Sequence, residues 1–208
     1  MYVDINETDN TGANALFLCS GDNSNLEVFR YLLKLGVELE SCKEKSILHY
    51  AIEHNNNEIT NYLVSKFKKK YINLYDSKGG TPLHYLIFSS DNINMLDYMI
   101  TNGADVNIKT KDETGDSILH LAVGFGKTEF VEYLLKNKLV KDINENNKKL
   151  VTPLHQAFLY NDDTIILEML LKHGADYSKL TCEGNTILHL AAINNKQCIL
   201  KYIFYFHN

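Results

Sequence analysis

The stretch Thr81-Pro82-Leu83-His84 decides the fold, because close variants of it return along the whole 208-residue chain. Six copies align, and their last residues follow one another at steps of 32, 35, 36, 35 and 34 positions. A fixed period of this length is typical of a solenoid, in which each repeat is one supersecondary unit. The other copies are Asn14-Ala15-Leu16-Phe17, Ser46-Ile47-Leu48-His49, Ser117-Ile118-Leu119-His120, Thr152-Pro153-Leu154-His155 and Thr186-Ile187-Leu188-His189.

Each copy predicts a pair of short amphipathic helices. The Ser or Thr can cap the first helix, and Pro82 falls at the first helical position, where its missing N–H costs nothing. A second apolar run, such as Leu134-Leu135, follows at helical spacing. Gly103 and Gly174 come just after such runs, where a left-handed turn that favours glycine ends a helix. Each pair leaves an apolar face uncovered, so neighbouring pairs must stack.

This pattern resembles the ankyrin-repeat family, whose signature is Thr-Pro-Leu-His-x-Ala at a period of about 33 residues. The resemblance covers essentially the whole chain. It implies an all-α fold, an ankyrin-repeat solenoid of stacked helix-turn-helix units with projecting β-hairpin or loop fingers. We expect a single domain over residues 1–208, with units at about 9–40, 41–75, 76–111, 112–146, 147–180 and 181–208 and a partial unit tail at 1–8.

A longer period of two repeats is also visible. The second and fourth units end in lysine-rich segments without glycine, at 65–73 and 136–144, whereas the odd units close with a glycine turn. Residues 2–6 match the tail of an even unit at 140–144. The chain therefore looks unfinished at both ends. It is either a segment of a longer array, or has ends that a partner covers, or is a short protein with adhesive ends.

Composition excludes several classes of protein. The chain is 45% hydrophobic and 23% charged, which is too apolar for disorder, and no apolar stretch reaches the length of a membrane helix. A net charge of −5 argues against nucleic-acid binding. The four cysteines show no paired spacing and there is no signal peptide. We expect reduced thiols and a cytoplasmic location, with the nucleus as an alternative, and no membrane partner.

Five histidines recur once per unit, but we interpret them as structural. Residues one repeat apart lie along the stack and cannot converge on one metal ion. Each imidazole is expected to bond to the Thr or Ser of its own tetrapeptide and to nearby backbone. The chain carries no nucleophile elbow and no phosphate-binding loop. We expect no enzyme activity, no cofactor, no metal and no small-molecule substrate.

The run Lys66 to Lys70, interrupted by Phe67, allows two interpretations. It could be a nuclear-localisation signal or a patch for an acidic surface. It could also be a helix end whose lysines complement the helix dipole. Lysines at the equivalent positions 136, 138 and 141 favour the second interpretation.

The extended concave face of a solenoid is its surface for recognition. The family resemblance implies that a partner protein meets the finger tips, Asp116 among them, and the ends of the first helices. Four aromatic residues could form an apolar strip across units three to five, and Leu150 takes the glycine position of an irregular finger. The candidate partner-binding residues are Tyr75, Lys78, Phe88, Glu113, Phe125, Lys148 and Tyr160, of which the strip comprises the aromatic ones.

The leading hypothesis is an adaptor or inhibitor that binds another protein. One alternative is a structural segment of a longer ankyrin array, in a scaffold or channel protein. Another is a pathogen or viral host-interaction factor, because paired, Asn- and Ile-rich units resemble those of poxviruses and some intracellular bacteria. The F-box-like segment that usually ends the poxvirus proteins is absent from this sequence, so recruitment of a ubiquitin ligase is not carried over.

Overall fold

The computed structural model describes residues 4–21, 25–39, 44–160, 164–197 and 200–201. In this part of the chain it contains eleven helices and no strand, so the expected all-α class is confirmed and the fingers are loops. The last apolar run of the sequence, at 203–204, lies outside the described residues, as do Cys42 and Cys198. The chain divides into two compact units, Met1–Asp105 and Val106–Asn208.

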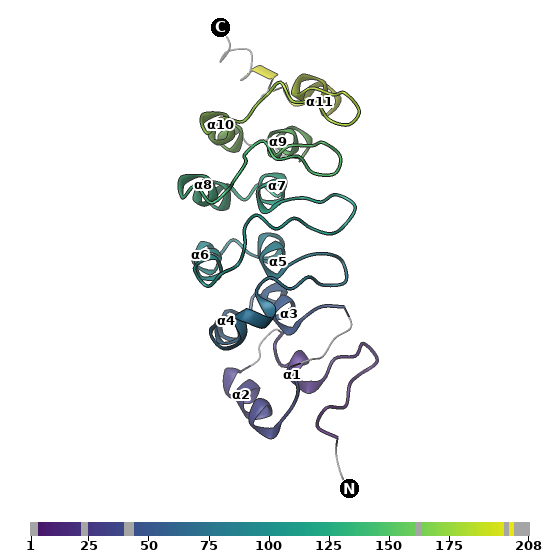
Figure 1. The fold of residues 1–208 in the computed structure, drawn as a ribbon, viewed down its shortest axis with the longest axis vertical. Helices are drawn as coiled ribbons and strands as arrows, with labels where there is room; N and C mark the ends of the chain where they lie inside the picture. The colour runs from purple at the N-terminus through teal and green to yellow at the C-terminus, as the bar shows by residue number, and fades with distance from the viewer. Residues whose placement is uncertain (1–3, 22–24, 40–43, 161–163, 198–199, 202–208) are drawn as a thin grey trace. The chain divides into compact units, whose positions relative to one another are not determined.

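Unit 1 is built from three helix pairs. Helix α3 packs against α4 and α5, α2 contacts α4, and α5 contacts α6. The first helix of each pair lies beside the finger loops, and the second helix lies on the side away from them (Figure 1). The six helices are α1 (Ala15–Leu18), α2 (Leu26–Leu35), α3 (Ile47–Glu53), α4 (Asn57–Tyr71), α5 (Pro82–Ser89) and α6 (Ile93–Thr101).

Unit 2 repeats this arrangement. Helix α7 packs against α8 and α9, α9 packs against α11, and α10 contacts both α8 and α9. The first helices again lie beside the fingers (Figure 1). Its helices are α7 (Ile118–Gly124), α8 (Thr128–Lys136), α9 (Pro153–Tyr160), α10 (Thr164–Lys172) and α11 (Ile187–Ile193).

The first helices begin as the sequence predicts. Ser117 and Thr186 cap α7 and α11, and each accepts a hydrogen bond from the backbone N–H of the histidine three residues on. The histidine side chain returns a contact to the cap backbone, which completes a capping box. The same box starts α3 at Ser46 and α5 at Thr81. The tetrapeptide is therefore a helix start with its own reciprocal cap.

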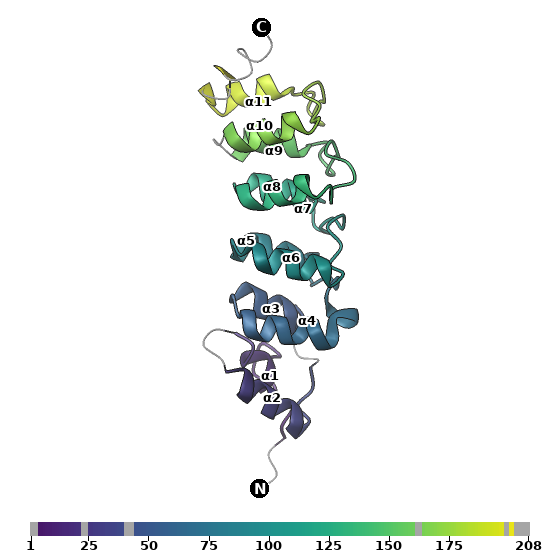
Figure 2. The ribbon, with the colours of Figure 1, turned by 90° about the vertical axis from the view of Figure 1, so that its left-hand side faces the viewer.

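The second helices end in two different ways. Gly36, Gly103 and Gly174 take the left-handed conformation that closes the helix, with φ of 93°, 101° and 90°. Lys138 makes the same turn after α8 with φ of 53°, although it carries a side chain. At the equivalent place in α4, Phe67 has a non-helical φ of −128° and makes a kink, beyond which helical backbone resumes and ends at Tyr71. Helix α4 is therefore 15 residues long against nine in α6, and its end reaches beyond that of α6 (Figure 2).

Candidate functional site

In two fingers the first residue supplies an oxygen acceptor that organises the turn. The Asp76 Oδ1 atom accepts hydrogen bonds from the backbone N–H groups of Lys78 and Gly80, at 3.1 and 2.7 Å. The Asn147 Oδ1 atom does the same for Lys149 and Val151, at 2.9 and 3.0 Å. Such side-chain acceptors fix tight turns without help from neighbouring elements.

Leu150 occupies the glycine position of its finger, as expected, and it keeps the glycine's backbone shape. Its φ is 54°, in the left-handed region, and its N–H donates to the Asn147 carbonyl. Gly79 makes the equivalent bond to the Asp76 carbonyl with φ of 83°. The finger thus has an unusual residue at this position but the usual backbone conformation, which is strained for a leucine.

Neighbouring fingers are joined by backbone hydrogen bonds. In unit 2 the N–H of Lys148 donates to Thr114 O at 2.9 Å, and that of Cys182 donates to Lys149 O at 3.1 Å. The Lys148 ammonium also donates to the carbonyl of Asp112. Lys148, a candidate for partner contact, therefore also fastens one finger to the next.

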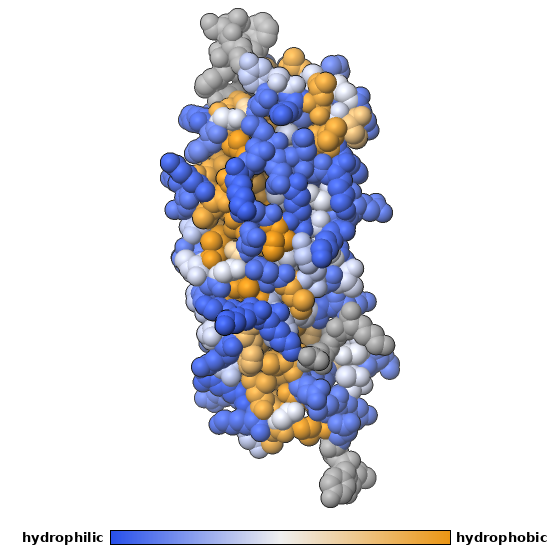
Figure 3. Space-filling view, in the orientation of Figure 1, coloured by the Kyte–Doolittle hydropathy of each residue, from blue (hydrophilic) through white to orange (hydrophobic). Residues whose placement is uncertain are grey.

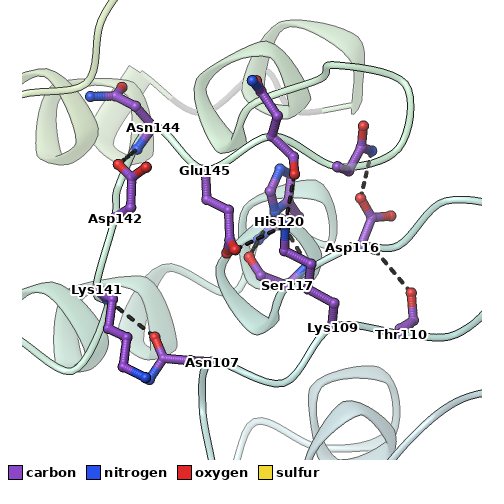
Figure 4. Close-up of polar contacts among 12 residues, drawn as sticks. Asn107, Lys109, Thr110, Asp116, Ser117, His120, Lys141, Asp142, Asn144 and Glu145 are labelled. Carbon is purple, nitrogen blue, oxygen red and sulfur yellow. Dashed lines mark hydrogen bonds and ion pairs between the residues drawn. The ribbon is translucent and has the colours of Figure 1, made fainter.

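The recurring histidines are held as the structural interpretation requires. The Nδ1 atom of His120 lies 2.7 Å from Ser117 Oγ and accepts from the Ser117 N–H (Figure 4). Its Nε2 atom donates to the carbonyl of Val151 at 2.9 Å. His49 bonds in the same way to Ser46 and to the carbonyl of Gly80. Each such imidazole ties its own helix start to the following finger.

Burial keeps these rings neutral. Removal from water lowers the pKa of His49 to about 4, although its bond to the Gly80 carbonyl opposes this. Burial likewise lowers the pKa of His120 and His155. Both ring nitrogens of these histidines are already engaged, and among the described residues no three His, Cys, Asp or Glu gather as metal ligands.

Three asparagines link even repeats to the glycine turn that follows, and the sequence interpretation missed them. Asn73 accepts from the Asp105 N–H at 2.9 Å and donates to the Gly103 carbonyl at 2.9 Å. Asn144 makes the same two bonds, to the N–H of Asp176 and the carbonyl of Gly174. Asn6 accepts from the Glu38 N–H at 2.9 Å. The Ile-Asn pair that ends all three segments was the available signal.

In unit 2, two aromatic candidates form one exposed ridge. Phe125 follows α7 and Tyr160 ends α9, at the same register, and these two helices pack together. Their exposed fractions are 53% and 68%. At the end of α11, Ile193 stands one position earlier in the register and is 67% exposed. We call Phe125, Tyr160 and Ile193 the apolar ridge.

The remaining candidates are divided between the two units. In unit 1 the Phe88 side chain is exposed near the end of α5, Lys78 is exposed at a finger tip and Tyr75 is half-buried. In unit 2 Glu113 is exposed on its finger. One finger position is corrected: Asp116 is buried and accepts a hydrogen bond from Asn147 at 2.7 Å, so it is part of the scaffold.

Helix α2 carries an apolar face that the sequence interpretation did not place. Val28 is 51% exposed, and Tyr31 and Leu35 are exposed on the same side. Figure 3 shows hydrophobic side chains gathered over α1 and α2. The residues at the position of Val28 in the later second helices are all buried: Ile59, Met95, Phe130 and Ile166.

Within the described residues, no helix has both the length and the apolar character that crossing a lipid bilayer requires.

A family model described as ankyrin repeats, in three copies, matches the chain in overlapping segments. These matches cover residues 2–76, 39–110, 66–147, 88–179 and 119–208. The expected resemblance is therefore supported from end to end.

Similar proteins come from a virus and from a bacterium. An ankyrin repeat protein of Acanthamoeba polyphaga mimivirus is 27% identical over 97% of this chain and 31% of its own length. The phosphocholine transferase AnkX of Legionella pneumophila is 31% identical over 91% of this chain and 22% of its own length. The chain thus spans less than a third of these relatives.

A solved structure shares the fold. It is one chain from the complex of a predatory endopeptidase of Bdellovibrio bacteriovorus with an immunity protein. The TM-score is 0.74 at 24% sequence identity, and the match covers 92% of this chain and 95% of that one. At this identity the likeness concerns the fold alone.

Proposed function

The chain belongs to the ankyrin-repeat family, and we propose that it is a non-catalytic adaptor or inhibitor that binds a partner protein. Ankyrin repeats are in general protein–protein interaction modules. What we propose in addition is which surface of this chain binds the partner. In this proposal the partner lies on the concave face, against the ends of the first helices and the fingers.

The observation that carries the proposal is the apolar ridge of unit 2. Phe125 and Tyr160 expose more than half of their side chains at equivalent places on two packed helices. Large aromatic residues contribute a disproportionate share of binding energy at protein interfaces. The ridge exposes apolar surface that a partner can cover, whereas His120 and the buried Asp116 serve the scaffold.

The comparisons support binding more than chemistry. AnkX is a transferase by name, yet this chain matches only 22% of its length. The solved neighbour comes from a complex of two proteins. We therefore assign this chain the role of a binding module and place no catalytic residue in it.

The test is capture of partners from a lysate of the source, with the whole chain as bait and identification by mass spectrometry. We expect Phe125→Ser with Tyr160→Ser to abolish retention of a partner that the wild type holds. The matched control is Ile165→Ser, which removes an exposed apolar side chain of the same unit from the second helix α10.

The outcome separates the ridge from general adhesion. Loss in the double variant with retention in the control supports the proposal, provided both variants keep the wild-type circular dichroism spectrum. If the double variant retains every partner of the wild type, the ridge is not the binding surface.

A second candidate role, a section of a longer array, is favoured by the open face of α2. One repeat further on, the Tyr62 ring packs against Phe29 with centroids 5.9 Å apart, and Tyr98 donates to the Asn61 carbonyl. Tyr31 holds the equivalent place in α2 and makes no such contact among the described residues.

Mass spectrometry of the protein purified from its source tests this second role. A mass well above the 23.8 kDa of this chain supports a longer array. An intact mass of 23.8 kDa contradicts it.

A further inference from the structure

The C-terminal half of α4 carries lysines that the repeat does not need. Lys66, Lys68 and Lys69 have exposed side chains on the extra helical turn of unit 1. This turn exists because Phe67 stands where the next repeat has Gly103. Phe67 does not take the left-handed conformation of that glycine: its φ of −128° and ψ of 15° make a kink, and helical backbone resumes beyond it and carries Lys68 and Lys69.

Two second helices of unit 2 pair their terminal lysine with an acid one turn earlier. In α8 Lys136 pairs with Glu132 one turn earlier, and in α10 Lys172 pairs with Glu168 at 3.6 Å. In α4 the residues one turn before Lys66 and Lys69 are Tyr62 and Ser65.

No carboxylate of the described chain forms an ion pair with Lys66 or Lys69. These two lysines lie three positions apart, on either side of the kink at Phe67, and their like charges repel. The dipole at the helix C-terminus offsets this repulsion only in part. The cluster therefore costs α4 stability that α8 and α10 do not lose.

Two cations of α2 extend the cluster. The Arg30 guanidinium lies over the Tyr62 ring, 5.2 Å from its centroid, and α2 packs against α4. Lys34 is exposed one turn beyond Arg30 on the same helix. Figure 3 shows a band of hydrophilic side chains over α4. We call Arg30, Lys34, Lys66, Lys68 and Lys69 the basic patch.

We propose that the basic patch is a docking surface for a short acidic segment of a partner protein, a run of a few Asp and Glu residues. Carboxylates complement the unpaired lysines and remove their mutual repulsion. The surroundings favour a short segment, because residues 1–105 contain fourteen Asp and Glu against nine Lys and Arg. A nucleic acid or a charged membrane would extend over these acids, whereas screening confines the attraction of the patch to about 8 Å.

The test is fluorescence anisotropy with the whole chain and a labelled short peptide of alternating glutamate and glycine, at physiological ionic strength. We expect saturable binding that weakens about tenfold or more in Lys66→Glu with Lys69→Glu, because each reversed charge repels the peptide. The matched control is Lys136→Glu with Lys172→Glu, which changes the net charge equally and alters exposed lysines of unit 2. The control should bind within about twofold of the wild type.

Additional variants and probes distinguish the possible outcomes. If the reversed-charge variant loses its circular dichroism spectrum, Lys66→Gln with Lys69→Gln replaces it, with a smaller loss expected. Phe125→Ser with Tyr160→Ser should leave peptide binding unchanged, which separates this surface from the apolar ridge. The proposal is overturned if the wild type does not bind, if both lysine pairs weaken binding equally, or if a DNA duplex or phosphatidylserine vesicles bind more tightly through the same lysines.

Discussion

The second helix of the first repeat has the same apolar pattern as the second helices of the later repeats, but its apolar side chains are less buried. In α8 the pattern buries Phe130 and Leu134 completely between neighbouring helices. In α2 the same two positions hold Val28, half exposed, and Leu32, half-buried. The periodicity of an amphipathic helix specifies which face is apolar, but burial depends on whether a neighbour supplies the opposite face. No neighbouring helix among the described residues covers the exposed apolar face of α2.

The sharpest test of this comparison truncates the same position in both helices. Phe130→Ala should lower the free energy of unfolding by about 3–5 kcal/mol, because it removes a fully buried ring. Val28→Ala should change it by less than about 0.5 kcal/mol, because the side chain is half in water. Urea unfolding followed by circular dichroism measures both. A large loss from Val28→Ala would mean that the α2 face is covered in solution.

Low pH should reduce the stability that a buried histidine such as His49 contributes, whereas the first repeat has Phe17 at this position and no group there to protonate. The folded-state pKa of His49 is about 4, below about 6.5 in the unfolded chain, so folding favours the neutral ring. Its contribution, about 3 kcal/mol, is complete above pH 6.5 and is lost as the pH falls towards 4.

Unfolding in urea across this pH range measures the loss. His49→Gln should flatten the dependence, because the variant has no imidazole to protonate at this position. Equal slopes for the wild type and His49→Gln would contradict a buried neutral imidazole.

A smaller effect distinguishes the finger of Leu150 from those that keep glycine. Leu150→Gly should raise the free energy of unfolding by up to about 1 kcal/mol, because glycine adopts a φ of 54° without strain. Gly184→Ala provides the reverse change, since no atom would crowd the added methyl group and only the backbone conformation opposes it. Thermal unfolding measures the two variants, and a destabilised Leu150→Gly would show that packing of the leucine outweighs the strain.

The smallest effect concerns the ends of α4 and α8. Ser65→Glu places an acid four positions before Lys69, across the kink at Phe67, and should stabilise the protein by at most about 0.3–0.5 kcal/mol. Glu132→Gln removes the existing pair with Lys136 and should cost a similar amount. Both effects should shrink in high salt. A destabilised Ser65→Glu would show that the lysine cluster already has a partner charge.

The elements of the fold could be predicted because they depend on local chemistry. The capping boxes at Ser117 and Thr186 and the left-handed glycines at 103 and 174 are specified by a few neighbouring residues. The structural role of the histidines followed from the same reasoning, since their partners include their own tetrapeptide.

What the sequence interpretation missed depends on residues far apart in the chain. The bonds of Asn73 and Asn144 join positions about 30 residues apart, and no local propensity indicates them. The burial of Asp116 requires Asn147 from the next finger. For the candidate site, the sequence identified Phe125 and Tyr160 by register, whereas their exposure depends on packing.

The asparagine links also bear on how such a chain can change its length over evolutionary time. Asn73 and Asn144 each fasten the end of an even repeat to the glycine turn of the odd repeat that follows. Asn107, at the end of an odd repeat, makes the corresponding bonds to the even repeat that follows: it accepts from the Lys141 N–H and donates to the Leu139 carbonyl. Junctions of both kinds therefore carry a matching asparagine. Gene duplication can copy a single repeat as well as a pair without losing this link.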